Sequence, residues 1–212
     1  MEYRKNDIVT LEIVDCGTDG EGIGKADGFT VFVKDAVIGD TVTAKIMKAK
    51  KNYGYGRLME ILKPSPYRVD PICPSARQCG GCQLQAVSYE EQKAFKEKKL
   101  RGHLERIGGF KELPMEPLIG MDEPYHYRNK AQFPVGRNKE GRIVTGFYAG
   151  RTHAIIENRD CALGLPQNKE VLDRVIAHME KYNIAPYDEM TGKGLVRHIF
   201  VRYGFFTGEL MV

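Results

Sequence analysis

Three cysteines lie close together in the stretch Cys73-Pro-Ser-Ala-Arg-Gln-Cys79-Gly-Gly-Cys82. Cysteine thiolates are ligands for both zinc and iron–sulfur clusters, and four of them commonly complete one site. The two glycines allow the backbone to turn tightly around a bound group. One further cysteine, Cys161, lies far downstream. We therefore predict a four-thiolate metal centre made by Cys73, Cys79, Cys82 and Cys161.

The spacing leaves the metal open between iron and zinc. Zinc sites often use two C-x-x-C pairs, and only Cys79 and Cys82 form such a pair here. This favours a [4Fe–4S] cluster over zinc, with buried thiols that hold no metal as the remaining alternative. The fifth cysteine, Cys16, has no partner nearby in the sequence, so we interpret it as a structural buried thiol.

A second candidate site is the basic and aromatic segment of residues 45–57. Cations pair with phosphates, and tyrosine rings stack on unpaired bases. We predict RNA binding by Lys48, Lys50, Lys51 and Tyr53. The alternative is a solvated β-hairpin with no ligand.

Basic residues also occur in two later segments that have the pattern of strands, residues 125–132 and 196–202. Arg128, Lys130 and Arg197 are predicted to extend the RNA-binding surface, the alternative being ordinary exposed strand positions. Residues 20–24, Gly-Glu-Gly-Ile-Gly, imitate a nucleotide-binding glycine motif, but no helix follows them. We interpret these glycines as a turn, and we predict no catalytic residue.

The elements that must position these residues are mainly β. Alternating or short apolar runs at 8–14, 29–33, 42–46 and 55–62, separated by Gly and Asp turns, predict a five-stranded OB-like barrel over residues 1–63. Pro64, Pro66 and Pro71 then indicate a stiff linker and a domain boundary.

Residues 64–212 are predicted to form an α+β domain with an antiparallel sheet. Ser88 and Glu91 form a capping box that begins a helix over 88–107, and an apolar stripe predicts a second helix over 166–183. Strands are expected at 127–135, 141–149, 153–157, 195–203 and 209–212. No turn signal follows the last strand, so we expect the sheet to continue beyond Val212.

The composition is that of an ordinary globular protein, with 42% hydrophobic and 28% charged residues. No apolar run is long enough to span a bilayer, and the charged N-terminus does not resemble a signal peptide. Both features favour the cytoplasm, where thiols stay reduced and bind metals. The net charge of +4 permits a nucleic-acid partner. Nothing in the sequence indicates a membrane or a protein partner.

Two parts of the sequence resemble known protein families. The first 62 or so residues resemble a TRAM domain, an RNA-binding barrel, through residues 20–24, 29–33, 36–40 and 53–55. The cysteine loop, Tyr127-Arg-Asn-Lys-Ala-Gln132, Cys161 and residues 195–202 follow in the order found in 23S rRNA (uracil-5-)-methyltransferases. The resemblance implies a [4Fe–4S] cluster on the four cysteines and 23S rRNA as the RNA partner.

Such enzymes continue into a domain that binds S-adenosylmethionine and carries a catalytic cysteine, and neither feature is recognisable in these 212 residues. We therefore expect the chain to be the RNA-binding and iron–sulfur portion of the enzyme. On this expectation it is inactive alone, S-adenosylmethionine binds only through the absent domain, and the helix over 88–107 packs on that domain.

Three alternatives stay open. One is an RNA-binding adaptor that has no catalytic activity and whose fold is stabilised by zinc or an iron–sulfur cluster. Another is a fragment of a tRNA uracil-C5 methyltransferase. A third is a radical or electron-transfer enzyme, although the spacing between Cys73 and Cys79 is longer than the C-x-x-x-C of radical enzymes.

Overall fold

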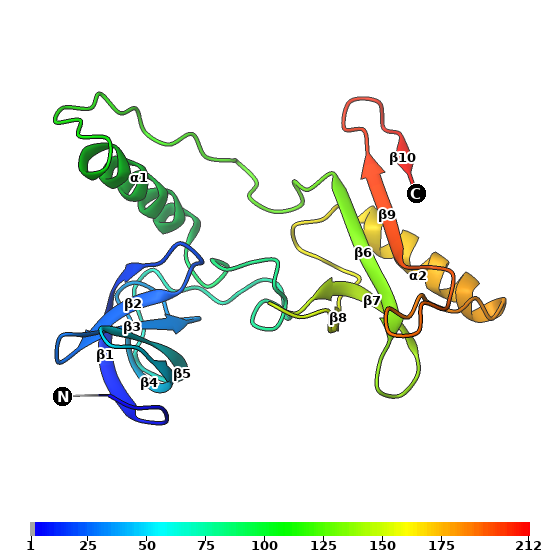
Figure 1. Ribbon diagram of the computed structural model, residues 1–212. Coiled ribbons are helices and arrows are strands. Elements are labelled where there is room, and N and C mark those ends of the chain that lie inside the picture. The colour runs from blue at the N-terminus through cyan, green and yellow to red at the C-terminus, as the bar shows by residue number, and fades with distance from the viewer. Residues whose placement is uncertain (1–2) are drawn as a thin grey trace. The chain divides into compact units, whose positions relative to one another are not determined.

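The computed structural model describes residues 3–212, so the first two residues of the predicted barrel domain lie outside the described residues. The chain divides into two compact units. One unit runs from the N-terminus to Pro71 and includes Gln83–Gly120, and the other contains Ile72–Cys82 and Met121–Val212. Figure 1 shows the course of the chain through both units.

The first unit contains the predicted closed five-stranded barrel. Its strands are β1 (Ile8–Cys16), β2 (Gly22–Ala26), β3 (Phe29–Lys34), β4 (Thr41–Ala49) and β5 (Tyr53–Lys63). They close in the order β1-β2-β3-β5-β4, with β3 and β5 parallel and the other pairs antiparallel. Alternate residues point inward, and the barrel core is formed by side chains such as Val31, Val42 and Ile46.

One prediction for this barrel is only partly right. We interpreted residues 20–24 as a turn, and Gly20 and Glu21 do lie in the turn between β1 and β2, whereas Gly22 and Gly24 lie in β2 and pair with β1 and β3. A Cβ atom on Gly22 would lie 2.8 Å from the carbonyl oxygen of Ala36, so the glycine allows the backbones to approach closely. The same glycines that normally signal a turn here mark a tightly packed strand.

A buried ion pair joins the barrel to the linker that follows it. Asp40 is fully buried and accepts backbone hydrogen bonds from Val37 at 2.7 Å and Ser65 at 2.8 Å. Its carboxylate also binds the Arg68 guanidinium, with an Nη2–Oδ2 distance of 2.5 Å. Burial alone would raise the pKa of Asp40, but the bonds from Arg68, Ser65 and Val37 outweigh burial and lower it.

The helix α1 (Tyr89–Arg106) begins as predicted, with the Ser88 side chain accepting a hydrogen bond from the Glu91 backbone at 3.4 Å. None of the residues within α1 is buried. Leu100 is 51% exposed, and Ile107 just beyond the helix is 81% exposed. The apolar side chains of α1 therefore have no core of their own among residues 3–212.

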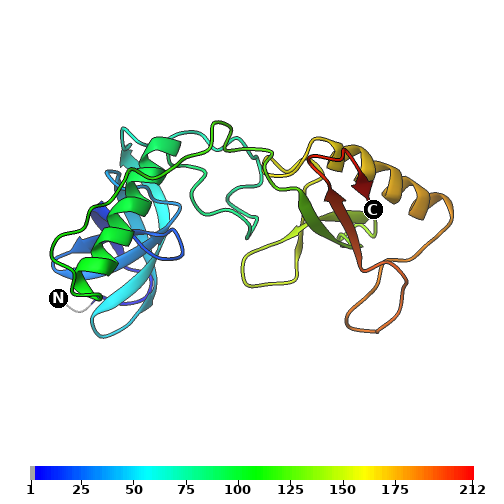
Figure 2. The ribbon, with the colours of Figure 1, turned by 90° about the horizontal axis from the view of Figure 1, so that it is seen from above.

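The second unit is an antiparallel sheet covered by one helix. The strands β6 (Lys130–Arg137), β7 (Ile143–Tyr148), β8 (Ile155–Glu157), β9 (His198–Tyr203) and β10 (Leu210–Met211) are ordered β10-β9-β6-β7-β8. Figures 1 and 2 show α2 (Gln167–Lys181) lying along one face of this sheet. Leu172, Ile176 and Met179 of α2 pack there against sheet residues that include Phe133. The predicted antiparallel sheet is thus confirmed.

No helix within the described residues is long and apolar enough to cross a membrane.

Candidate functional site

Three aromatic side chains form an exposed cluster on the barrel, which we call the aromatic face. Phe32 of β3 lies 5.8 Å from Tyr53 and 5.6 Å from Tyr55 of β5, measured between ring centroids. The two tyrosine rings lie 5.8 Å apart. Tyr53 is 37% and Tyr55 is 41% exposed, so both present ring surface to a ligand. Such a cluster is typical of surfaces that stack on unpaired bases.

The sequence Tyr53-Gly-Tyr-Gly produces this face through the alternation of a strand. The tyrosines point outward, and Gly54 and Gly56 point into the barrel. A Cβ on Gly56 would lie 3.0 Å from a methyl group of Val31 and 3.2 Å from the Cβ of Ala44. Glycine therefore keeps β3, β4 and β5 close together, which brings the aromatic rings of neighbouring strands into contact.

The predicted lysines lie beside this face. Lys48 is paired with Tyr55 across β4 and β5, and the Lys50 backbone donates to the Tyr53 carbonyl at 2.8 Å. Lys48, Lys50 and Lys51 are all exposed. The structure thus brings together the lysines and Tyr53 that we predicted. Sequence reasoning missed Phe32, although its position between the buried Val31 and Val33 was a signal that its ring points outward.

The four predicted metal-binding cysteines all belong to the second unit. The cysteine loop packs against the end of β7. There the backbone of Cys79 forms an isolated β-bridge with that of Ala149, and the Gly80 backbone donates to the Tyr148 carbonyl at 3.0 Å. A Cβ on Gly80 would lie 3.0 Å from the Cα of Gly150, so a larger residue would force the loop to shift slightly away from Gly150. The contact holds the loop on the sheet.

The thiol of Cys79 is close enough to Cys73 and Cys161 to interact with them electrostatically. Burial is the largest cause of its raised pKa, and the two neighbouring thiols add to the shift. Even so, no group of three or more His, Cys, Asp or Glu residues in the described part of the chain is arranged to hold a metal ion. The predicted iron–sulfur site therefore stays a prediction.

Two of these thiols accept hydrogen bonds at sulfur. The Gly81 backbone donates to the Cys79 sulfur at 3.4 Å, and the side-chain amide of Asn158 donates to the Cys73 sulfur at 3.5 Å. Asn158 is 9% exposed, and its side-chain oxygen also accepts from the Asp160 backbone, next to Cys161. It thus connects the two segments that carry cysteines. No sequence signal pointed to Asn158, because it lies in a loop far from Cys73 along the chain.

Cys16 lies apart from these thiols, at the end of β1 in the barrel unit. Burial, followed by the nearby Glu21 and Asp15 carboxylates, raises its pKa to about 11. The thiol therefore stays protonated near neutral pH and is a poor ligand or nucleophile.

The other three predicted RNA-binding residues have different neighbours. Arg128 lies close enough to Cys79 to lower the pKa of that thiol. Lys130 begins β6, and its ammonium lies 5.3 Å from the centre of the Phe200 ring. Arg197 lies near the other end of β6, where its carbonyl accepts from the Val135 backbone. Each of the three residues thus has its own set of contacts.

Comparisons with known proteins identify the barrel and the relatives of the chain. Residues 4–59 match the TRAM domain family. A protein of Halalkalibacterium halodurans named an uncharacterized RNA methyltransferase is 44% identical over 209 residues, which cover 99% of this chain and 45% of the relative. One of Clostridium tetani with the same description is 44% identical over 212 residues, covering 100% of this chain and 46% of the relative.

A solved structure shares the fold. It is the Pyrococcus abyssi tRNA (uracil-54, C5)-methyltransferase in complex with S-adenosyl-L-homocysteine. The TM-score is 0.69 at 24% sequence identity, and the match covers 95% of this chain and 44% of that chain. The chain therefore contains a TRAM domain, has RNA methyltransferases as homologues, and spans slightly less than half the length of the curated relatives it matches.

These matches contradict two predictions. We predicted that the chain is only the RNA-binding and iron–sulfur portion of an enzyme, and that its 212 residues are inactive alone. Homologues named RNA methyltransferases instead match 99% or more of the chain, and its fold matches 44% of the chain of a solved methyltransferase. The prediction of inactivity was wrong because it took the lack of a recognisable glycine motif and catalytic cysteine as evidence that the chain is inactive.

Proposed function

We propose that this protein is an S-adenosylmethionine-dependent RNA methyltransferase that modifies C5 of uracil. The homologues named RNA methyltransferases support the reaction class. The shared fold with a uracil-C5 methyltransferase supports the target atom. S-adenosylmethionine supplies the methyl group in this chemistry, and the residues described above bind and orient the RNA.

The observation that carries the proposal is the aromatic face within the TRAM domain. Phe32, Tyr53 and Tyr55 offer ring surface for unpaired bases, and the lysines of β4 and the following turn offer charge for the phosphates. A methyltransferase must reach C5 of a base that stacking would otherwise cover. A surface that holds neighbouring bases unstacked on its aromatic rings serves that requirement.

The RNA that we propose is 23S rRNA, as the resemblance of the cysteine loop and the later motifs implies. The structural neighbour acts on tRNA according to its title, so tRNA is the alternative. Both RNAs are cytoplasmic in bacteria, and we propose the same location for this protein because its cysteines are of the kind that reducing conditions preserve.

We further propose that Cys73, Cys79, Cys82 and Cys161 hold a [4Fe–4S] cluster. The chemistry of the donor set supports this proposal, because it consists of four thiols from two segments of one unit, and Cys79 lies close enough to Cys73 and to Cys161 to interact with both. The hydrogen bonds from Gly81 and Asn158 are of the type that surrounds cluster sulfurs. The cluster would fix the cysteine loop to the segment before α2, which is a structural role.

Mass spectrometry of cellular RNA tests the proposed reaction. Deleting the gene should remove 5-methyluridine from one or more positions of 23S rRNA, and restoring the gene should return it. Loss of 5-methyluridine from tRNA alone would show that tRNA, the alternative, is the substrate. Unchanged 5-methyluridine in both RNAs would contradict the proposal.

A further inference from the structure

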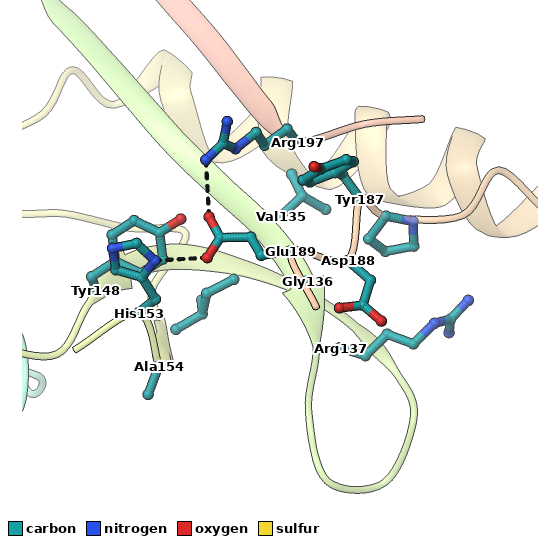
Figure 3. Close-up of a pocket in the computed structure, with 12 residues that line it drawn as sticks. Val135, Gly136, Arg137, Tyr148, His153, Ala154, Tyr187, Asp188, Glu189 and Arg197 are labelled. Atoms are coloured by element: carbon teal, nitrogen blue, oxygen red, sulfur yellow. Dashed lines mark hydrogen bonds and ion pairs between the residues drawn. The ribbon is translucent and has the colours of Figure 1, made fainter. Parts of the chain in front are cut away.

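The second unit contains a pocket that the proposals above do not use. Its volume is about 450 Å³, within the range of roughly 300–1,000 Å³ that is common for ligand sites. The pocket lies between β6, the segment that joins β7 to β8, and the loop before β9 (Figure 3). The side chains that matter for its chemistry are those of Tyr148, His153, Tyr187, Asp188, Glu189 and Arg197.

Glu189 is the central group of this pocket. One carboxylate oxygen pairs with His153 Nδ1 at 2.7 Å, and the other accepts from Arg197 Nη2 at 3.0 Å. Figure 3 shows Glu189 between these two side chains. The bond to His153 and then the bond to Arg197 lower the pKa of Glu189, so it is ionised near neutral pH. Because each carboxylate oxygen has two lone pairs, both oxygens can accept a further hydrogen bond.

Aromatic rings border the same carboxylate. The rings of Tyr148 and His153 are stacked, with centroids 4.8 Å apart and planes 19° from parallel. The His153 side chain is 70% exposed, so its outer face is open to a third ring. On the other side, the Arg197 guanidinium lies 5.5 Å from the centre of the Tyr187 ring. A planar ligand could thus extend an existing stack while its edge faces Glu189.

The charges argue against a phosphate as the ligand. Asp188 and Glu189 balance Arg137 and Arg197 around the pocket when His153 is neutral. A phosphate would be repelled by the two carboxylates. A neutral base that carries donors and an acceptor on one edge fits better, because the carboxylate of Glu189 and the guanidinium of Arg197 lie side by side.

Among the four bases, guanine matches this pair. Its Watson–Crick edge presents two adjacent donors, N1–H and the N2 amino group, next to the acceptor O6. The donors match the two oxygens of Glu189, and O6 matches Arg197. Adenine and cytosine place an acceptor beside their single amino group, and uracil flanks its one donor with two carbonyl oxygens. Each of these would face the carboxylate with a lone pair.

We propose that this pocket binds one unpaired guanine of the RNA substrate, read on its Watson–Crick edge by Glu189 and Arg197 and stacked on His153. The assignment rests on the proposed function, because it takes RNA as the ligand. It gives the second unit a base-specific role, whereas the aromatic face of the barrel tolerates any base.

Fluorescence anisotropy with short single-stranded RNAs tests the pocket separately from the barrel. The probes are a uridine-only oligonucleotide and three versions with a single central G, A or C. We expect the G version to bind about tenfold more tightly than the other three, in line with a bidentate base contact. Inosine, which lacks the N2 amino group, should lose most of this preference.

Glu189→Gln should abolish the preference for G and leave the affinity for the uridine-only RNA unchanged. Glu170→Gln is the matched control, because Glu170 is an exposed glutamate that pairs with an arginine on α2 and lies outside the pocket. Circular dichroism checks that both variants fold. Equal affinities for the four RNAs, a preference for another base, or an equal loss for all RNAs in Glu189→Gln would overturn the guanine site. Failure of the wild-type protein to bind even the uridine-only RNA would instead count against RNA binding by the barrel.

Discussion

The two compact units build their candidate sites in different ways. In the barrel, the aromatic face comes from neighbouring strands whose alternation puts rings outside and glycines or valines inside. In the second unit, the cysteines and the pocket residues come from loops that are far apart in the sequence. A site built on strand alternation depends on the register of the strands, whereas a site built from loops depends on a few contacts that hold the loops together.

The largest effect expected from this difference concerns the cysteines. Replacing Cys161 by serine removes the only thiolate from the downstream segment, so we expect nearly complete loss of iron from protein prepared without air. Cys16→Ser should retain full iron content, because Cys16 lies in the other unit. Iron analysis and the visible absorption spectrum measure both variants. Full iron content in Cys161→Ser would refute the proposed ligand set.

The next effect concerns the buried pair of the barrel unit. Arg68→Ala leaves the buried Asp40 carboxylate without its charged partner, and we expect a loss of about 3 kcal/mol of unfolding free energy. Urea denaturation followed by tyrosine fluorescence measures it. Arg174→Ala removes an exposed arginine of an i, i+4 pair and serves as the control, with little expected change. Similar stability of the two variants would show that the linker is not held to the barrel by this contact.

The same pair predicts a dependence on pH. The pKa of Asp40 is lower in the folded protein than its unfolded value of about 3.9. Its contribution to stability is therefore present in full above that value, and it is lost as the pH falls through the folded pKa. We expect the barrel to lose stability below about pH 4, and less steeply in Asp40→Asn. Denaturation midpoints at a series of pH values test this, and parallel curves for the two proteins would contradict it.

A smaller effect is expected at the aromatic face. Tyr53→Ala removes a stacking surface, which should weaken binding of single-stranded RNA about tenfold regardless of sequence. Tyr53→Phe keeps the ring and should bind nearly as well as the wild type. Fluorescence anisotropy separates the two, and an equal loss in both variants would point to the hydroxyl group instead of the ring.

The smallest effect is expected from single lysines. Lys50→Ala should weaken RNA binding modestly at low salt and reduce the slope of log affinity against log salt by about one. Lys181→Ala, on α2 of the other unit, should leave the slope unchanged. An unchanged slope in Lys50→Ala would remove this lysine from the phosphate contacts.

The sequence predicted more of the barrel than of the second site, for physical reasons. Strand alternation and the capping box at Ser88 are local patterns, so the closed barrel and the start of α1 could be predicted. The strand β2 was missed because Gly22 and Gly24 allow close packing as readily as they allow a turn. Asn158 and Glu189 could not be predicted, since their partners Cys73 and His153 lie on distant segments that only the tertiary fold brings near.

The central claim is that the barrel presents RNA to a uracil-C5 methyltransferase reaction. The most direct test replaces the gene with one that encodes Tyr53→Ala and Tyr55→Ala together and measures 5-methyluridine in 23S rRNA. The account predicts a strong loss of methylation while the amount of protein and its iron content match those of the wild type. Methylation at the wild-type level in these cells would contradict it.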